Sequence, residues 1–303
     1  MEISIALPQS GKHASPETIA YAAREADRLG YGTVWVLERL LRPVNPRSSP
    51  DRPARPMPES YANVYDPIET LTYVAAMTER VKLGTSIIDA LFHVPAILAR
   101  RFATLDHFSN GRIIAGLGQG YSPEEFTAAN VPMSRRGAGF EEFIGAMRAA
   151  WGPDPVTFSG RFYTIPESQI NPKPLQDGGP PIVIAAMQKP AVERAGRMGL
   201  GLNPLAPGWE ALEDALGAFR NAARAAGHDS GALPVVVRAN TAVGEEPEPE
   251  GRTPLSGSYE QVAEDFERLR EMEVDEVLFD MNRFSIPVEE QFRVLNSLRA
   301  AAP

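Results

Sequence analysis

Residues 66–88 read DPIETLTYVAAMTERVKLGTSII and contain, in one short stretch, the alternation that decides the fold. Asp66 before Pro67 is typical of a helix start, because aspartate can cap the first free N–H groups and proline is tolerated at the first helical position. Glu69 is placed to complete a capping box with Asp66. Apolar residues then recur at helical spacing, and the aliphatic run at 81–88 predicts a buried strand.

The same alternation of helix and strand continues in both directions from this stretch. Amphipathic segments begin at helix-start signals such as Ser15-Pro16 and Ser258 with Gln261. Runs rich in Val, Ile and Leu, typical of strands buried on both faces of a parallel sheet, occupy residues 3–7, 33–37, 81–88, 112–117, 181–185, 200–203, 235–239 and 276–280. Roughly eight such units predict an α/β fold with one (β/α)₈ TIM-barrel domain over residues 1–303. A doubly wound open sheet is the competing topology.

Composition excludes several classes of function. The chain has no cysteine, which excludes disulfides, thiolate catalysis and cysteine-ligated metals. Its net charge is −9 and it has no block of basic residues, so we expect no nucleic-acid partner. The chain lacks a long apolar run and a signal peptide, so we expect a cytoplasmic protein without a membrane partner. The four histidines show no metal-ligand spacing, which predicts no metal site and surface or packing roles for His13, His93, His107 and His228.

Two connections are too long for plain loops. Residues 38–65, rich in Pro and Arg, follow the second predicted strand at its carboxyl end. Residues 152–180 precede the fifth strand and contain a possible short hairpin at 156–163. Long excursions in a compact domain are usually lids or binding loops, and a decorative or oligomer-contacting insertion is the alternative for each.

The active site of a (β/α)₈ barrel lies at the carboxyl ends of its strands. Glu38 and Arg39 follow a buried run directly, and a buried acid and base are costly unless they are paired or functional. Gly118-Gln119-Gly120 fails the nicotinamide-dinucleotide pattern, because residue 121 is tyrosine where a glycine is needed. These glycines either let a strand end approach a planar ligand or form a tight turn without one.

Two further strand ends carry polar or special residues. Ser86, Ile87 and Asp89 end the third strand. Met187-Gln188 ends the fifth strand and leads into a helix start, where free N–H groups could hold a phosphate or merely make an ordinary connection. From the residues alone we infer a cofactor-binding barrel.

The chain resembles the bacterial luciferase-like family of flavin and deazaflavin oxidoreductases over nearly its whole length. Each motif is weak alone, but their order and spacing are specific. They are LGYGTVWV at 29–36, DPIETL at 66–71, TERVKLGTS at 78–86, ATLD at 103–106, SNGR at 109–112, GQG at 118–120, EEF at 124–126, PKP at 172–174 and PPI at 180–182.

The segment GTSI at 84–87 resembles the deazaflavin branch of that family, whose cofactor is the 8-hydroxy-5-deazaflavin coenzyme F-420 (F420). The resemblance implies a non-proline cis peptide between Ser86 and Ile87 that backs the cofactor ring. It also implies a set of cofactor-lining residues: Glu38, Ser86, Ile87, Asp89, Gln119, Gly120, Met187 and Gln188.

The chain departs from the family pattern at two positions. Relatives often have Asp-His where this chain has Glu38-Arg39, and sugar-phosphate-oxidising relatives have a glutamate where it has Tyr121. We therefore expect a substrate other than a sugar phosphate. Glu38, Arg39 and Tyr121 are the catalytic candidates, with Arg39 or Tyr121 orienting or protonating a substrate oxygen.

The resemblance implies an F420-dependent oxidoreductase that transfers a hydride to or from an organic substrate. An FMN-dependent monooxygenase of the same fold is the alternative, and a non-catalytic cofactor-binding barrel is the alternative from another class. Relatives are commonly dimers, so we expect a homodimer that takes a small-molecule substrate.

Overall fold

The computed structural model describes residues 1–48 and 53–301, and its central strands lie where the sequence predicts them. The barrel strands are β1 (Glu2–Ala6), β2 (Thr33–Val36), β3 (Lys82–Thr85), β4 (Ile88–Asp89), β5 (Ile113–Gly118), β8 (Ile182–Ile184), β9 (Gly201–Leu202), β10 (Val236–Ala239) and β13 (Glu276–Phe279). Two small pairs lie outside them: β6 (Val156–Ser159) with β7 (Thr164–Ser168), and β11 (Val243–Gly244) with β12 (Gly257–Ser258).

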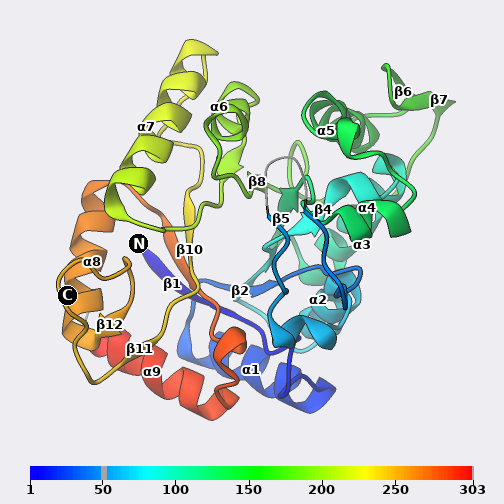
Figure 1. The fold of residues 1–303 in the computed structure, drawn as a ribbon. Coiled ribbons are helices and arrows are strands. Elements are labelled where there is room, and N and C mark those ends of the chain that lie inside the picture. The colour runs from blue at the N-terminus through cyan, green and yellow to red at the C-terminus, as the bar shows by residue number, and fades with distance from the viewer. Residues whose placement is uncertain (49–52, 302–303) are drawn as a thin grey trace.

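Helices surround these strands (Figure 1). The α-helices are α1 (Pro16–Leu29), α2 (Pro67–Ala75), α3 (Pro95–Ser109), α4 (Pro123–Ala128), α5 (Ala138–Trp151), α6 (Lys189–Arg197), α7 (Trp209–Ala225), α8 (Tyr259–Glu271) and α9 (Val288–Ala301). Short 3₁₀ turns are η1 (Glu59–Ala62), η2 (Ala90–Phe92), η3 (Met133–Arg135) and η4 (Asn282–Phe284).

The sheet is a parallel barrel, so the open doubly wound alternative is wrong. Its strands run in the order β10-β13-β1-β2-β3-β5-β8-β9, and β4 pairs with β5 just beyond β3. Parallel bridges from Leu202 to Val235 and from Leu205 to Arg238 join the two ends of this path. The carboxyl ends of all eight strands therefore meet at one rim.

Capping explains where several helices begin. The Ser258–Gln261 capping box is present, and Ser15 forms another box with Thr18. The expected box between Asp66 and Glu69 is wrong. Asp66 caps the N–H of Ile68 at 3.0 Å, but the Glu69 carboxylate turns outward to Arg101 at 2.6 Å.

The barrel interior is filled at the end opposite the rim. Trp35 is fully buried inside the ring, and its indole N–H donates to Glu276 at 2.6 Å. A Cβ on Gly84 would lie 2.4 Å from the Trp35 ring, so glycine makes room for that side chain. Burial raises the pKa of Glu276, although Ser4, Trp35 and Thr33 oppose the shift by hydrogen bonding to the carboxylate. This packing leaves the opposite rim as the place for a ligand.

The two predicted insertions pack against different parts of the barrel. Residues 38–65, of which 49–52 lie outside the described residues, cover the rim: Arg47 pairs with Glu124 of α4 at 3.3 Å. In the second insertion Gln176 donates to the carbonyl of Ile113 at the start of β5, whereas the turn of the hairpin lies near the start of α5, where Phe162 packs against Arg135 of η3. The predicted hairpin exists, but its second strand begins at Thr164, one residue beyond the predicted end.

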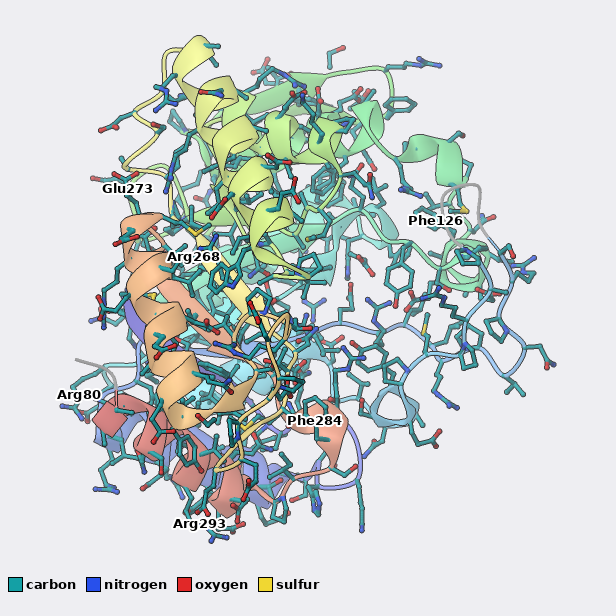
Figure 2. The ribbon with its side chains drawn as sticks, turned by 60° about the vertical axis from the view of Figure 1, so that its left-hand side comes forward. Arg80, Phe126, Arg268, Glu273, Phe284 and Arg293 are labelled. Carbon is teal, nitrogen blue, oxygen red and sulfur yellow. The ribbon has the colours of Figure 1, made fainter. Side chains whose placement is uncertain are left out.

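Contacts between neighbouring outer helices complete the shell. Arg268 of α8, labelled in Figure 2, lies with its guanidinium carbon 4.3 Å from the centre of the Trp209 ring at the start of α7. Among the described residues, no helix combines the length and apolar character needed to cross a membrane.

Candidate functional site

A cis peptide joins Ser86 to Ile87 between β3 and β4, which confirms the expected bulge. The bulge is tied to β2 on one side. The N–H of Ser86 donates to the carbonyl of Val36 at 2.6 Å, and the N–H of Glu38 donates to the carbonyl of Ile87 at 2.9 Å. Glu38 is thereby fixed beside the bulge.

The opposite wall of the barrel holds the same bulge. The Ser86 hydroxyl donates to Oδ1 of Asn203 at 2.7 Å, and Arg238 donates to the Ser86 carbonyl at 2.9 Å. Arg238 also pairs with the buried Asp280 at 2.5 Å. Ser86, Arg238 and Asp280, with Gln9, line a small hollow in the mouth of the barrel.

A cluster of charged groups lies next to the bulge. Arg39 donates to Glu125 at 2.9 Å, and its guanidinium lies 3.8 Å from Asp89. The same guanidinium lies over the rings of Tyr61 and Tyr121, at 5.4 and 4.8 Å from their centres. The structure therefore brings Glu38, Arg39, Asp89 and Tyr121 together, as the sequence-based prediction requires.

Burial controls the protonation of this cluster. Burial raises the pKa of Asp89 to about 7; the Arg39 charge opposes the shift, and the carboxylates of Glu125 and Glu38 add to it. Burial also raises the pKa of Glu125, again against Arg39. For Arg39, burial alone would lower the pKa, but Asp89, Tyr121 and Glu125 outweigh it and raise the pKa above its ordinary value. Asp89 can thus hold or release a proton near neutral pH.

The strand-end glycines make room for the side chains that pack beside the bulge. A Cβ on Gly118 would lie 2.5 Å from Cδ1 of Ile87 and 3.1 Å from Oδ1 of Asp89. Gly120 has φ +74, and a Cβ there would lie 2.9 Å from the Phe92 ring. Gly120 therefore needs both the conformation and the space that only glycine offers.

The other predicted cofactor residues lie apart from the charged cluster. The Gln119 side chain accepts from the N–H of Gly137 at 2.6 Å, ahead of α5. Met187 is exposed, and its sulfur accepts from the N–H of Leu205 at 3.2 Å. Gln188 precedes α6 and makes no side-chain cap there. Met187 and Gln188 thus belong to the β8 sector of the rim.

Unsatisfied polar atoms gather at this rim. Five buried side-chain atoms of the described residues lack a hydrogen-bond partner, and four of them lie in the loops at this end: Ser10 Oγ, Arg39 Nε, Ser60 Oγ and Asp89 Oδ2. Buried polar groups are normally paired, so such a concentration is consistent with a polar ligand at the rim. The unpaired atoms beside the bulge fit a ligand with polar edges.

The structure adds three residues that sequence reasoning missed. His93 lies beside Glu38, with Nε2 2.7 Å from Oε1. Glu125 and Arg238 are the partners of Arg39 and of the bulge. His93 closely follows Asp89 in the loop after β4, so its position in that loop was the available signal. The absence of metal-ligand spacing among the histidines does not reveal a pairing of His93 with a carboxylate.

Comparisons with known proteins agree with this geometry. A family model described as luciferase-like monooxygenase matches residues 1–250. An uncharacterized protein of Mycobacterium tuberculosis is 35% identical over 171 residues, which make up 56% of this chain and 61% of that protein. An F420-dependent glucose-6-phosphate dehydrogenase of Amycolatopsis mediterranei is 28% identical over 205 residues, 66% of this chain and 56% of the relative. The chain thus matches less than two thirds of the length of these relatives.

Solved structures share the fold over almost the full length. The monooxygenase RslO1 from Streptomyces bottropensis superposes with a TM-score of 0.78 at 23% identity, covering 99% of this chain and 98% of the other. The F420-dependent tetrahydromethanopterin reductase from Methanopyrus kandleri gives 0.75 at 17% identity, covering 96% and 97%. At these identities the likeness supports the barrel fold alone.

Proposed function

The chain belongs to the luciferase-like monooxygenase family, and from this membership we propose that it is an F420-dependent oxidoreductase that moves a hydride between the deazaflavin and an organic substrate. The relative from Amycolatopsis mediterranei is an F420-dependent dehydrogenase by name, which supports the deazaflavin branch. We propose that the substrate is not a sugar phosphate. This chain has Tyr121 at the position where sugar-phosphate-oxidising relatives have a glutamate.

One observation carries the proposal. The cis bulge at Ser86–Ile87 lies against the glycine surface at Gly118, and unpaired Asp89 and Arg39 atoms flank it. A flat ring with polar edges would stack on the bulge and satisfy these atoms. Ser86, Ile87, Asp89 and Gly120 would hold such a ring, and Gln119, Met187 and Gln188 would contact the rest of the cofactor.

The bound deazaflavin supplies the hydride chemistry, and the protein supplies orientation and charge. Arg39 is held by Glu125 and lies over Tyr121, so its guanidinium stays at the rim with a fixed direction. A fixed cation of this kind can orient a substrate oxygen. Residues 38–48 and 53–65 lie at the same rim and can exclude water from it.

A binding titration tests the proposal. We expect the fluorescence of F420 to change on binding to the protein, and Gly118→Ala to weaken that binding about 10-fold or more, because the added methyl must push Ile87 toward the ring. Gly217→Ala is the matched control, since a Cβ at that α7 position meets nothing within 4 Å. The proposal fails if F420 does not bind, or if both alanine variants bind it like the unaltered protein.

An FMN-dependent monooxygenase is the second candidate, favoured by the similarity in fold to the monooxygenase RslO1. Flavin reacts with oxygen, whereas a 5-deazaflavin does not. Oxygen consumption with reduced FMN, together with tighter binding of FMN than of F420, would establish this candidate. Binding of either cofactor without turnover on a broad substrate panel would instead favour a non-catalytic barrel.

We also propose that the protein forms a homodimer through adjoining helices α2 and α3. Large apolar side chains lie exposed on this pair of helices: Tyr73, Val94, Ile97 and Phe108. An apolar surface of this kind on a soluble fold is typical of a contact with another protein.

A further inference from the structure

Glu38 and His93 form a carboxylate–imidazole pair at the rim. Nε2 of His93 lies 2.7 Å from Oε1 of Glu38, and Oε2 of Glu38 accepts the N–H of Asp89 at 2.8 Å. Both carboxylate oxygens are thereby used, so Glu38 is held in one orientation. The pair draws its two members from different strand ends, β2 and β4.

The imidazole is free on its other side. No partner is found for Nδ1 of His93 among the described residues, and the side chain is 20% exposed, whereas that of Glu38 is 11% exposed. If Nε2–H donates to the carboxylate, Nδ1 carries the lone pair.

We propose that His93 is the proton-transferring residue of the site, that Glu38 positions it, and that the substrate is therefore an alcohol and carbonyl pair. The inference rests on the proposed F420-dependent function. Hydride transfer alone needs no acid or base, whereas interconversion of an alcohol and a carbonyl moves a proton together with the hydride. A built acid–base pair therefore favours a substrate whose oxidation or reduction also moves a proton, and an alcohol and carbonyl pair is the member of that class that loses or gains its proton at an exposed oxygen.

The step balances as follows in the oxidative direction. The C–H bond of the alcohol breaks, and its electron pair leaves with the hydrogen as hydride to the bound deazaflavin. The O–H bond breaks, its proton goes to Nδ1 of His93, and the C=O bond forms. The reverse direction returns the proton from Nδ1 to the carbonyl oxygen. The Glu38 carboxylate stabilises the imidazolium in both directions.

The charges around His93 come from three elements. Glu38 and Arg39 follow β2, Asp89 ends β4, and Glu125 lies in α4. Arg39 and Glu125 offset one another, which leaves Glu38 as the group in direct contact with the imidazole.

Chemical labelling tests the placement of His93 without turnover. Diethylpyrocarbonate modifies an accessible, unprotonated imidazole nitrogen, and peptide mass spectrometry gives the rate at each histidine. We expect labelling of His93 in the free protein and protection by saturating F420. His107 is the internal control, because its Nε2 contacts the Lys173 carbonyl at the other end of α3. A His93 that is unreactive, or reactive but not protected, overturns the inference.

Kinetics test the role and the substrate class. With 2-propanol and cyclohexanol as probes, we expect His93→Gln to lower kcat about 100-fold while the Kd for F420 stays within about two-fold. Glu38→Gln should lower kcat about 10-fold, and His107→Gln should leave it unchanged. Unchanged Kd values also show that the variants are folded. If F420 does not bind, the proposed function itself fails. If F420 binds but His93→Gln turns over normally, or the protein oxidises neither alcohol, only this inference fails.

Discussion

Asp89 is an acid whose surroundings oppose its charge. It is 2% exposed, it lies near Glu125 and Glu38, and one of its oxygens lacks a hydrogen bond. Arg39, at 3.8 Å, and a hydrogen bond from the backbone of Gly120 favour its ionised form. A group so placed lowers the stability of the apo protein whenever it is ionised, which is typical of a residue retained for a ligand.

The raised pKa of Asp89 predicts a pH-dependent stability. The folded protein holds a proton on Asp89 up to about pH 7, whereas an unfolded aspartate loses it near pH 4. Stability from this group is therefore fully present below pH 4, falls as pH rises toward 7, and is constant above. Asp89→Asn removes this pH dependence. The difference in free energy of unfolding between the variant and the unaltered protein should therefore shift by about 3 kcal/mol in favour of the variant from pH 5 to pH 8.

Urea unfolding at both pH values measures this difference. Asp214→Asn, on the exposed side of α7, is the control and should show no such gain. A difference between the unaltered protein and Asp89→Asn that does not change with pH would show that Asp89 is ionised throughout.

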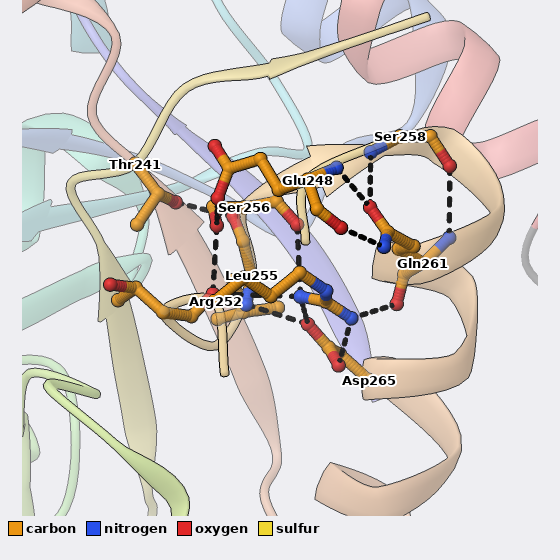
Figure 3. A network of polar contacts seen from close by, with 9 residues as sticks. Thr241, Glu248, Arg252, Leu255, Ser256, Ser258, Gln261 and Asp265 are labelled. Carbon is orange, nitrogen blue, oxygen red and sulfur yellow. Dashed lines mark hydrogen bonds and ion pairs between the residues drawn. The ribbon is translucent and has the colours of Figure 1, made fainter. Parts of the chain in front are cut away.

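The loop that joins β10 to α8 is an element that the sequence analysis did not single out. Residues 240–258 are fastened by the network in Figure 3. Arg252 pairs with Asp265 of α8 through two nitrogens, at 2.6 and 2.7 Å, and Asp265 also accepts the N–H of Leu255. Gln261 binds the backbone of Glu248 on both its donor and acceptor sides. The network fixes a loop that follows a strand end at the rim.

Arg252→Ala should free this loop. The change leaves the nearly buried Asp265 with its backbone contact to Leu255 and no cation, which costs about 3 kcal/mol of unfolding free energy. Hydrogen exchange of residues 241–257 should rise while the barrel strands stay protected. Arg293→Ala is the matched control: Arg293 pairs with Glu290 on the surface of α9, where an ion pair contributes little. Equal exchange in both variants would contradict the role given to Arg252.

At the scale of the whole molecule, closure of the barrel brings distant segments together at one rim. β9 and β10 meet through the bridge from Leu202 to Val235, and this places Arg238 and Asn203 across from Ser86. The site therefore depends on residues that are separated by more than one hundred positions in the chain.

The proposed dimer belongs to the same scale. Ile97 is 47% exposed on α3, and lysine at this position would place a charge in the proposed contact. Ile97→Lys should shift the protein from dimer to monomer in sedimentation velocity. Phe284→Lys changes a comparably exposed apolar residue of η4, away from these helices, and should leave the dimer intact. A monomeric unaltered protein would refute the dimer, and a dimeric Ile97→Lys would place the contact elsewhere.

The sequence by itself determined the barrel, because periodicity, caps and aliphatic runs are local properties. All eight predicted strands are present, and the motif at 84–87 indicated the cis bulge before the structure showed it. The neighbours Glu38, Arg39 and Asp89 were also identified, since the ends of parallel strands meet at one rim.

Only the tertiary structure decided which groups touch. The pairing of Glu38 with His93, of Arg39 with Glu125 and of Arg238 with Ser86 joins residues on different loops. It also decided that Glu69 binds Arg101 instead of completing a capping box. Such contacts depend on side-chain directions and on burial after the barrel closes, and neither is encoded in local spacing.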